Sequence, residues 1–155
     1  MAKKKASPLF TIGYEQAKSD SVLNELKAAK VELLVDVRAV AASRRPGFSK
    51  RQLAAGLDDY GIGYLHLRAL GTPKQGRLAA RGGDLETLWR IYEKHLKTPE
   101  ARQELAELAA LVASGRRVCL LCYERDVNHC HRRRVAELIH ERTGATVKNL
   151  MAPLF

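Results

Sequence analysis

The sequence predicts an α/β fold in three layers, with helices on both faces of a mostly parallel, five-stranded sheet of Rossmann-like or flavodoxin-like type. Five apolar, β-rich runs alternate with helical patterns along the chain, which favours right-handed crossovers between parallel strands. Two of these runs are almost continuously apolar, as is typical of strands covered on both faces. A length of 155 residues fits one domain. We expect a disordered basic tail at residues 1–8 and a single α/β domain at residues 9–155.

The expected strands are short runs in which β-branched and other apolar residues predominate. The second and the fourth contain the continuous sequences Leu-Leu-Val-Asp-Val and Val-Cys-Leu-Leu-Cys. Together with the helical patterns, the runs give the order β-α-β-α-β-α-α-β-α-β. The predicted strands are residues 9–13, 32–37, 63–67, 117–122 and 146–150.

The first two helices are predicted from apolar spacing and from their ends. Residues 21–30 place their apolar side chains on one stripe, as an amphipathic helix does. The second helix begins at Ser49, and Gln52 three residues later completes the pattern of a capping box. Gly61 is suited to end that helix.

Three more helices follow, each with a recognisable start or stop. Asp84 is a helix N-cap residue, and Thr98 followed by Pro99 is another N-terminal signal. Gly115 ends the fourth helix, and the last helix spans residues 128–143. Two irregular stretches remain, residues 39–48 and 68–83, and long loops of this kind often carry function. The side chains expected to be buried by these helices include Leu85, Leu88, Trp89, Tyr92, Leu105, Leu108, Val112, Val135, Leu138 and Ile139.

Composition indicates a cytoplasmic protein without a membrane span. No apolar run approaches 18 residues, and the N-terminal Met-Ala-Lys-Lys-Lys lacks the apolar region of a secretory signal. The three cysteines are odd in number and close together, which favours reduced thiols over a disulfide framework. The sequence identifies no cofactor and no oligomeric state.

A formal net charge of +10 is compatible with a polyanionic partner. Three of the charges, on Lys3, Lys4 and Lys5, lie in the expected tail, and the remaining excess is spread over helices and loops. Charge alone therefore leaves a polyanion partner and a merely basic surface as equal alternatives.

Polar side chains follow several predicted strands, at the edge where parallel sheets bind ligands. Tyr14 and Glu15 follow the first strand, and Glu124 follows the fourth. Asp36 lies inside the apolar second run, and a buried carboxylate needs a partner. Arg38, two residues on, faces the same side. Asp36 is therefore either one half of a structural ion pair or a site residue.

The segment 122–132 carries the densest set of reactive side chains. It leaves a buried strand and enters a helix whose first turn we expect to hold Cys130, His131 and Arg132. A thiol at a helix N-terminus beside His and Arg has a lowered pKa and is a better nucleophile. Arginine at a helix N-terminus needs an offsetting negative charge, either a nearby acid such as Glu124 or a bound anion. Cys122 is the alternative nucleophile.

A metal site is the competing interpretation of the same segment. The spacing Cys119-x2-Cys122-x7-Cys130-His131 resembles a Cys3His donor set. Cys119 and Cys122 point to opposite faces of one strand, which excludes their joint chelation and also a thioredoxin-type redox pair. The reduced set of Cys122, Cys130 and one histidine remains a minor alternative, and we assign no metal ligand.

Taken together, these motifs resemble a bacterial family known only as domain of unknown function 488. The resemblance spans nearly the whole chain, although each piece is short, and Thr72 stands where many relatives have a second glycine. It implies an α/β domain and no particular reaction. The matching pieces are Thr11-Ile-Gly-Tyr-Glu15, Val35-Asp-Val-Arg38, the basic run from Ser43 to Phe48, Tyr64, Leu70-Gly71 with Pro73, Leu120-Leu-Cys-Tyr-Glu124 and Cys130-His-Arg132.

We therefore expect a polar site at the carboxyl edge of the sheet that binds a phosphate-bearing ligand, a small molecule such as a nucleotide or a nucleic acid. Whether it is an enzyme stays open; the candidates for catalysis are Asp36, Cys122, Glu124 and Cys130. The candidates for ligand binding are Tyr14, Glu15, Arg38, Ser43, His131 and Arg132. The alternatives are a Cys/His metal-binding protein, or a nucleic-acid-binding module without chemistry that uses Arg44, Arg45, Lys50, Arg51, Lys74, Arg77 and Arg81.

Overall fold

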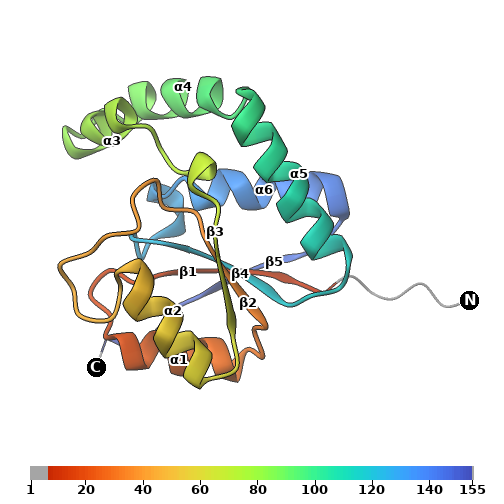
Figure 1. Ribbon diagram of the computed structural model, residues 1–155. Coiled ribbons are helices and arrows are strands. Elements are labelled where there is room, and N and C mark those ends of the chain that lie inside the picture. The colour runs from red at the N-terminus through yellow and green to blue at the C-terminus, as the bar shows by residue number, and fades with distance from the viewer. Residues whose placement is uncertain (1–6, 155) are drawn as a thin grey trace, which may run out of the picture.

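The computed structural model of the chain describes residues 7–154, which form a five-stranded sheet between two layers of helices (Figure 1). The strand order is β3-β2-β4-β1-β5, and all four pairings are parallel. This confirms the predicted three-layer α/β fold, with a wholly parallel sheet. The strands are β1 (Leu9–Gly13), β2 (Leu33–Asp36), β3 (Gly63–His66), β4 (Val118–Cys122) and β5 (Val147–Leu150).

The three central strands are the ones whose sequences are most apolar. Every residue of β1, β2 and β4 is buried, because helices cover both of their faces. The edge strands β3 and β5 are partly exposed and more polar. The buried centre therefore holds Asp36 at the end of β2 as well as Cys119 and Cys122 in β4.

The two faces of the sheet have separate cores. Helices α1 (Ser19–Ala28) and α2 (Lys50–Asp59) cover one face, and α5 (Pro99–Ala113) and α6 (Arg132–Thr143) cover the other (Figure 1). Cys119 belongs to the core beneath α1 and α2, whereas Cys122 belongs to the core beneath α5 and α6. The inference that these two thiols point to opposite faces is confirmed.

The stretch 68–83, expected to be irregular, contains a short 3-10 turn (Arg68–Leu70) and the helix α3 (Lys74–Arg81). That expectation was wrong because α3 has hardly any apolar face to recognise: its one buried residue is Gly76. A Cβ on Gly76 would lie 3.5 Å from side-chain atoms of Leu88 and Ile91, which belong to α4 (Leu85–His95). α3 thus packs against α4 with Gly76 in the contact, on the α5–α6 side of the sheet (Figure 1).

The predicted helix starts at Ser49, Asp84 and Thr98 are confirmed, whereas the capping box predicted at the first of them is wrong. Asp84 caps α4 by accepting from Thr87 N at 3.1 Å, and Thr98 caps α5 in the same manner. No capping box forms at α2, because Ser49 Oγ exchanges hydrogen bonds with the backbone of Ser43 and the side chain of Gln52 accepts from Gly47 N. Leu85, expected to be buried, is 40% exposed at the first position of α4.

The last helix begins later than its apolar pattern suggests. A 3-10 turn (Val127–His129) precedes it, Cys130 is extended, and α6 starts at Arg132. Gly144 ends α6 with φ of 75°, as predicted from the sequence. Residues 1–6 of the expected tail lie outside the described residues, while Ser7 Oγ donates to the carbonyl of Gly115 at 2.9 Å. Within residues 7–154, no helix has the length and apolarity needed to cross a bilayer.

Candidate functional site

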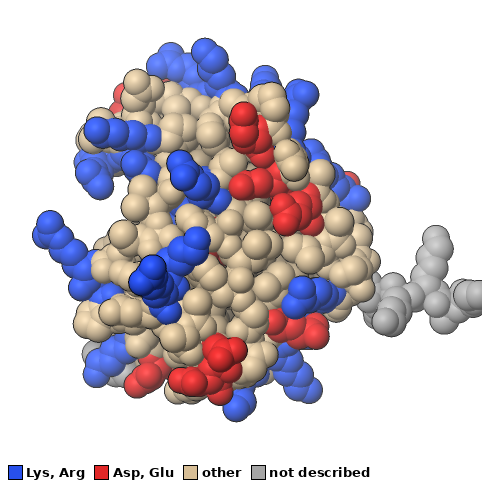
Figure 2. All heavy atoms as spheres, in the orientation of Figure 1, with Lys and Arg blue, Asp and Glu red and all other residues tan. Residues whose placement is uncertain are grey.

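A cavity of about 370 Å³ opens at the carboxyl edge of the sheet, between the loop that follows β2 and the helix α3. This is the edge at which the sequence places a site. In Figure 2 the outline is indented on the left between these two segments, and basic side chains surround the indentation. The lining residues are Tyr14, Arg38, Ala39, Val40, Ala42, Thr72, Arg77, Ala80, Arg81, Leu88, Cys122, Tyr123, Glu124, His129 and His131.

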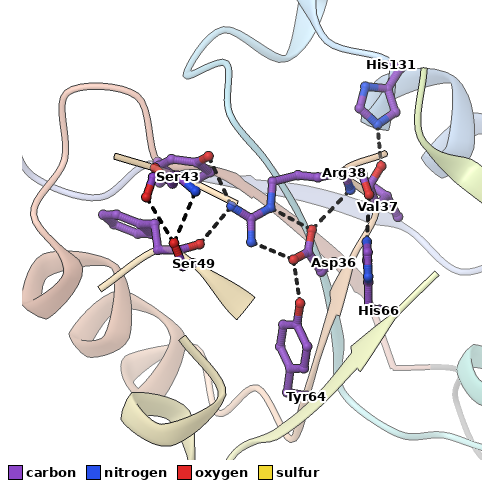
Figure 3. Close-up of polar contacts among 10 residues, drawn as sticks. Asp36, Val37, Arg38, Ser43, Ser49, Tyr64, His66 and His131 are labelled. Carbon is purple, nitrogen blue, oxygen red and sulfur yellow. Dashed lines mark hydrogen bonds and ion pairs between the residues drawn. The ribbon is translucent and has the colours of Figure 1, made fainter. Parts of the chain in front are cut away.

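Asp36 and Arg38 form a buried ion pair behind one wall of this cavity (Figure 3). Arg38 Nε and Nη2 donate to the two carboxylate oxygens of Asp36 at 2.9 and 2.7 Å. Tyr64 Oη donates to Asp36 Oδ2 at 2.6 Å, so both oxygens are engaged in a side chain that is 0% exposed. Of the two alternatives for Asp36, the geometry corresponds to the structural ion pair.

This ion pair changes the acidity of its partners. Burial works against the charged guanidinium, but the hydrogen bonds to Asp36 outweigh it, and the pKa of Arg38 is raised. Burial raises the pKa of the Tyr64 phenol, and the hydrogen bond to Asp36 and the negative charge of Asp36 raise it further. Arg38 thus stays charged and Tyr64 stays a donor near neutral pH.

Arg38 also shapes the loop that walls the cavity. Its Nη1 donates to Tyr14 Oη at 3.1 Å and to the carbonyl of Phe48 at 2.8 Å, which ties the end of the loop to the end of β1. Ser43 contacts the loop itself: its backbone N donates to Ser49 Oγ, and its Oγ accepts from Arg45 N. Ser43 therefore organises the loop and lies outside the cavity lining.

Three side chains of the types that ligate metal ions meet on the floor of the cavity. Cys122 Sγ, Cys130 Sγ and a ring nitrogen of His131 lie within 4.8 Å of one another, and all three residues are buried. His131 Nδ1 is 3.5 Å from Cys122 Sγ and 3.9 Å from Cys130 Sγ. His131 Nε2 lies 2.7 Å from the carbonyl of Val37 (Figure 3). Because a carbonyl only accepts, Nε2 carries a proton and Nδ1 is the nitrogen that faces the sulfurs.

The two thiols of this cluster differ sharply in acidity. Burial raises the pKa of Cys122 well above its usual value. Burial also opposes ionisation of Cys130, but a hydrogen bond from Cys122 and the charge of His131 outweigh it and lower the pKa of Cys130 well below its usual value. Burial alone would lower the pKa of His131, but the charge of Cys130 outweighs it and raises that pKa.

Glu124 lies beside Cys122, with its Oε2 3.4 Å from Cys122 Sγ. Burial, and after it the charge of Cys130, raise the pKa of the Glu124 carboxyl to about 7. The chain carrying Glu124 crosses the end of β1 so closely that a Cβ on Gly13 would fall 1.8 Å from the carbonyl oxygen of Glu124. Only glycine fits there, which accounts physically for the Gly-Tyr-Glu sequence at this strand end.

Two predicted ligand-binding residues support this segment from outside the cavity. Arg132 is 1% exposed, and its guanidinium donates to the carbonyls of Glu124 and Arg125. Glu15 Oε1 accepts from Arg125 N at 3.0 Å. Both side chains hold the segment after β4 in place, and neither lines the cavity.

Two basic lining residues were expected only in the alternative of a nucleic-acid-binding module, within a stretch where no helix was predicted. Arg77 and Arg81 lie one helical turn apart on α3 and line the cavity from that helix. Within residues 7–154, neither forms an ion pair with an acid. The spacing of the two arginines was readable from the sequence, but their direction depends on how α3 packs against α4.

The structure divides the predicted site residues into those that line the cavity and those that support it. Asp36, Ser43, Glu15 and Arg132 support the walls, each through the hydrogen bonds given above. Cys130 is next to Cys122 and His131 but is not a lining residue. The predicted residues that line the cavity are Tyr14, Arg38, Cys122, Glu124 and His131.

Comparison with known protein families gives a match over most of the chain. A family model described as "Domain of unknown function DUF488" matches residues 18–139, which include every cavity residue except Tyr14. No curated protein and no solved structure matches the chain.

Proposed function

Because the chain belongs to the family described as domain of unknown function DUF488, whose name specifies no reaction, we propose a function from the cavity itself. The protein binds a phosphate-bearing small molecule of the nucleotide class between α3 and the carboxyl edge of the sheet, and acts on it at the floor of the cavity. The observation that carries this proposal is that two arginines without an ion-pair partner among residues 7–154 share one cavity with a buried Cys/His/Glu cluster.

Size and charge support a small phosphate-bearing ligand. Cavities of about 300–1,000 Å³ bind drug-sized molecules, and this one measures about 370 Å³. Arg77 and Arg81 supply two guanidinium groups, whose planar donors match phosphate oxygens. Glu124 is the one acidic residue that lines the cavity within the described part of the chain, so the lining is positive overall.

The floor supplies the groups that can react. Cys122, Glu124 and His131 face the cavity, and Cys130 adjoins them. A buried cluster of thiol, imidazole and carboxyl groups with strongly shifted pKa values is typical of catalytic sites. Asp36 and Arg38 serve this site by holding the loop wall, which makes them positioning residues.

The proposal is tested by titrating the protein with inorganic phosphate, nucleoside monophosphates and triphosphates, and a short single-stranded oligonucleotide, by calorimetry at two salt concentrations. Nucleotides should bind, and the loss of each charge-assisted hydrogen bond should cost about 1.5 kcal/mol, or roughly tenfold in affinity. Arg77→Ala and Arg81→Ala should therefore each weaken nucleotide binding about tenfold.

The matched control is the double variant Arg102→Ala/Arg142→Ala, which removes two exposed arginines that do not line the cavity. It should bind nucleotides as the wild type does, whereas Arg77→Ala/Arg81→Ala should not. Equal binding by the two double variants would contradict the cavity as the site. Binding of the oligonucleotide alone, with a steep salt dependence, would replace the proposal with a nucleic-acid-binding function.

A further inference from the structure

The floor of the cavity carries a set of side chains that could bind a metal ion. Two thiols and one imidazole nitrogen, from β4 and from the residues just before α6, converge at one point. All three side chains are buried, at 4%, 1% and 8% exposure for Cys122, Cys130 and His131. Soft sulfur and imidazole donors are the preferred ligands of zinc.

The two sulfur–nitrogen distances in this cluster are close to those of a tetrahedral site around one ion. With Zn–S of about 2.3 Å and Zn–N of about 2.0–2.1 Å, tetrahedral angles place sulfur and nitrogen roughly 3.6 Å apart. His131 Nδ1 lies 3.5 Å from one sulfur and 3.9 Å from the other. Shifts of a few tenths of an ångström would bring both sulfur–nitrogen distances to this value, and the two sulfurs lie within 4.8 Å of each other.

The histidine is also oriented as a metal ligand should be. Ligating histidines almost always donate their second ring N–H to a carboxylate, a carbonyl or water, which fixes the tautomer and the ring plane. His131 Nε2 has this contact, 2.7 Å from the carbonyl of Val37 (Figure 3). The lone pair of Nδ1 is thereby left for the side of the ring that faces the two sulfurs.

The fourth side of the cluster faces the cavity. Cys122 and His131 line the cavity and Cys130 does not, and from this we infer that an ion held by the three would have its remaining coordination position toward the ligand space. Glu124 borders that position, with its Oε2 3.4 Å from Cys122 Sγ. Three protein ligands with an open fourth position characterise catalytic zinc sites, and four protein ligands characterise structural ones.

We propose that Cys122, Cys130 and His131 bind one Zn²⁺ ion whose fourth coordination position opens into the cavity. Such an ion polarises a bound oxygen, which fits a phosphate-bearing ligand held by Arg77 and Arg81. The part that the metal plays in the reaction rests on the proposed function, whereas the metal site rests on the three side chains alone.

The test begins with the full chain, purified in a phosphine reductant without chelator, and its metal content measured by mass spectrometry before and after dialysis against Zn²⁺. One zinc per chain is expected for the wild type and for Cys119→Ala, which removes the thiol on the opposite face of the sheet. Cys122→Ala, Cys130→Ala and His131→Ala should each retain less than about a tenth of that zinc against a competing chelator. Circular dichroism checks that each variant is folded.

Two measurements on the wild type keep the test decisive if a variant does not fold. X-ray absorption at the zinc edge should show two sulfur ligands at about 2.3 Å together with nitrogen or oxygen ligands. Co²⁺ in place of Zn²⁺ should give a sulfur-to-cobalt charge-transfer band. A wild type that takes up no zinc, a zinc site without sulfur, or undiminished zinc in Cys122→Ala would overturn the proposal.

The outcomes separate this proposal from the proposed function. If zinc binds as expected but nucleotides do not, the metal site stands and the nucleotide-binding function fails. If nucleotides bind through Arg77 and Arg81 while no zinc is bound, the metal site fails and the binding function stands.

Discussion

Replacing Asp36 with Asn is expected to destabilise the fold strongly, because it leaves a buried arginine without its counter-charge. Arg38 is 5% exposed and Asp36 is 0% exposed, so solvent cannot take over the role of the carboxylate. The amide keeps the shape of the side chain, but its Nδ2 is a donor and would face the donors of Arg38 and Tyr64.

The expected magnitude follows from the interactions that the carboxylate makes. Removing one partner of a buried ion pair costs about 3–5 kcal/mol. The introduced amide would still offer its Oδ1 to Arg38 N and Nε, so we place the cost at the lower end, about 3 kcal/mol. For a domain of this length, that cost corresponds to a fall of roughly 10 °C in Tm. Tyr64→Phe removes a single hydrogen bond to a charged group and should cost about 1.5 kcal/mol.

The assay is urea unfolding followed by circular dichroism at neutral pH, with the slope of the transition checked so that only stability is compared. Asp59→Asn is the matched control, because it makes the same chemical change at an exposed position on α2. It should shift the free energy of unfolding by less than about 0.5 kcal/mol.

An Asp36→Asn variant as stable as Asp59→Asn would refute this reasoning. It would mean that the carboxylate does not compensate Arg38, and it would return Asp36 to the set of candidate catalytic groups. A destabilised variant that still binds nucleotides well below its Tm would instead support a positioning role.

Two further predictions concern the wall of the cavity and the helix layer above it. Gly13→Ala should destabilise the protein by about 1–3 kcal/mol or more, since the new Cβ would meet the backbone of Glu124. The control is Gly82→Ala, which should be tolerated because its Cβ would meet nothing nearer than 3.6 Å. Thermal denaturation compares the stability of the two variants. Equal stability would contradict the close approach of the Glu124 backbone to Gly13. Burial raises the pKa of Glu104, whose Oε2 has no hydrogen-bond partner among the described residues. A carboxyl whose pKa is higher in the folded than in the unfolded state weakens the fold as pH rises from the unfolded-state pKa to the folded-state pKa. Glu104→Gln should therefore raise Tm at pH 7, and this gain should be gone once the pH has fallen to the unfolded-state pKa of about 4.3. A gain that persists at low pH would refute this origin.

The sheet was predictable because its strands carry their signal locally. In β2 and β4 continuous apolar runs identify buried parallel strands, and the caps at Asp84 and Thr98 require only a few consecutive residues. α3 was not predictable in this way. Its one buried residue is Gly76, which weakens a helix on its own and adds no apolar side chain to a pattern.

The site was predictable in its place more than in its membership. The rule for parallel sheets pointed to the edge at which the cavity opens, since every strand of this sheet ends there. The ion pair of Asp36 with Arg38 was one of the two alternatives that the sequence offered, but the hydrogen bond from Tyr64 comes from another strand. The role of Arg132 was not readable, because its guanidinium binds backbone carbonyls. Every residue has a backbone carbonyl, so the sequence does not show which carbonyl will accept a hydrogen bond.

The convergence of the Cys/His cluster was likewise difficult to predict from the sequence. From the sequence, the spacing Cys-x7-Cys-His is unlike the short knuckles that announce structural zinc, and Cys119 had to be discarded from it. In the fold, β4 ends at Cys122 and the chain returns through the 3-10 turn so that Cys130 and His131 reach the same point. Val37, the residue after β2, supplies the carbonyl that sets the histidine tautomer. Three segments thus define the donor set together, and this makes zinc content the measurement that decides what the floor of the cavity does.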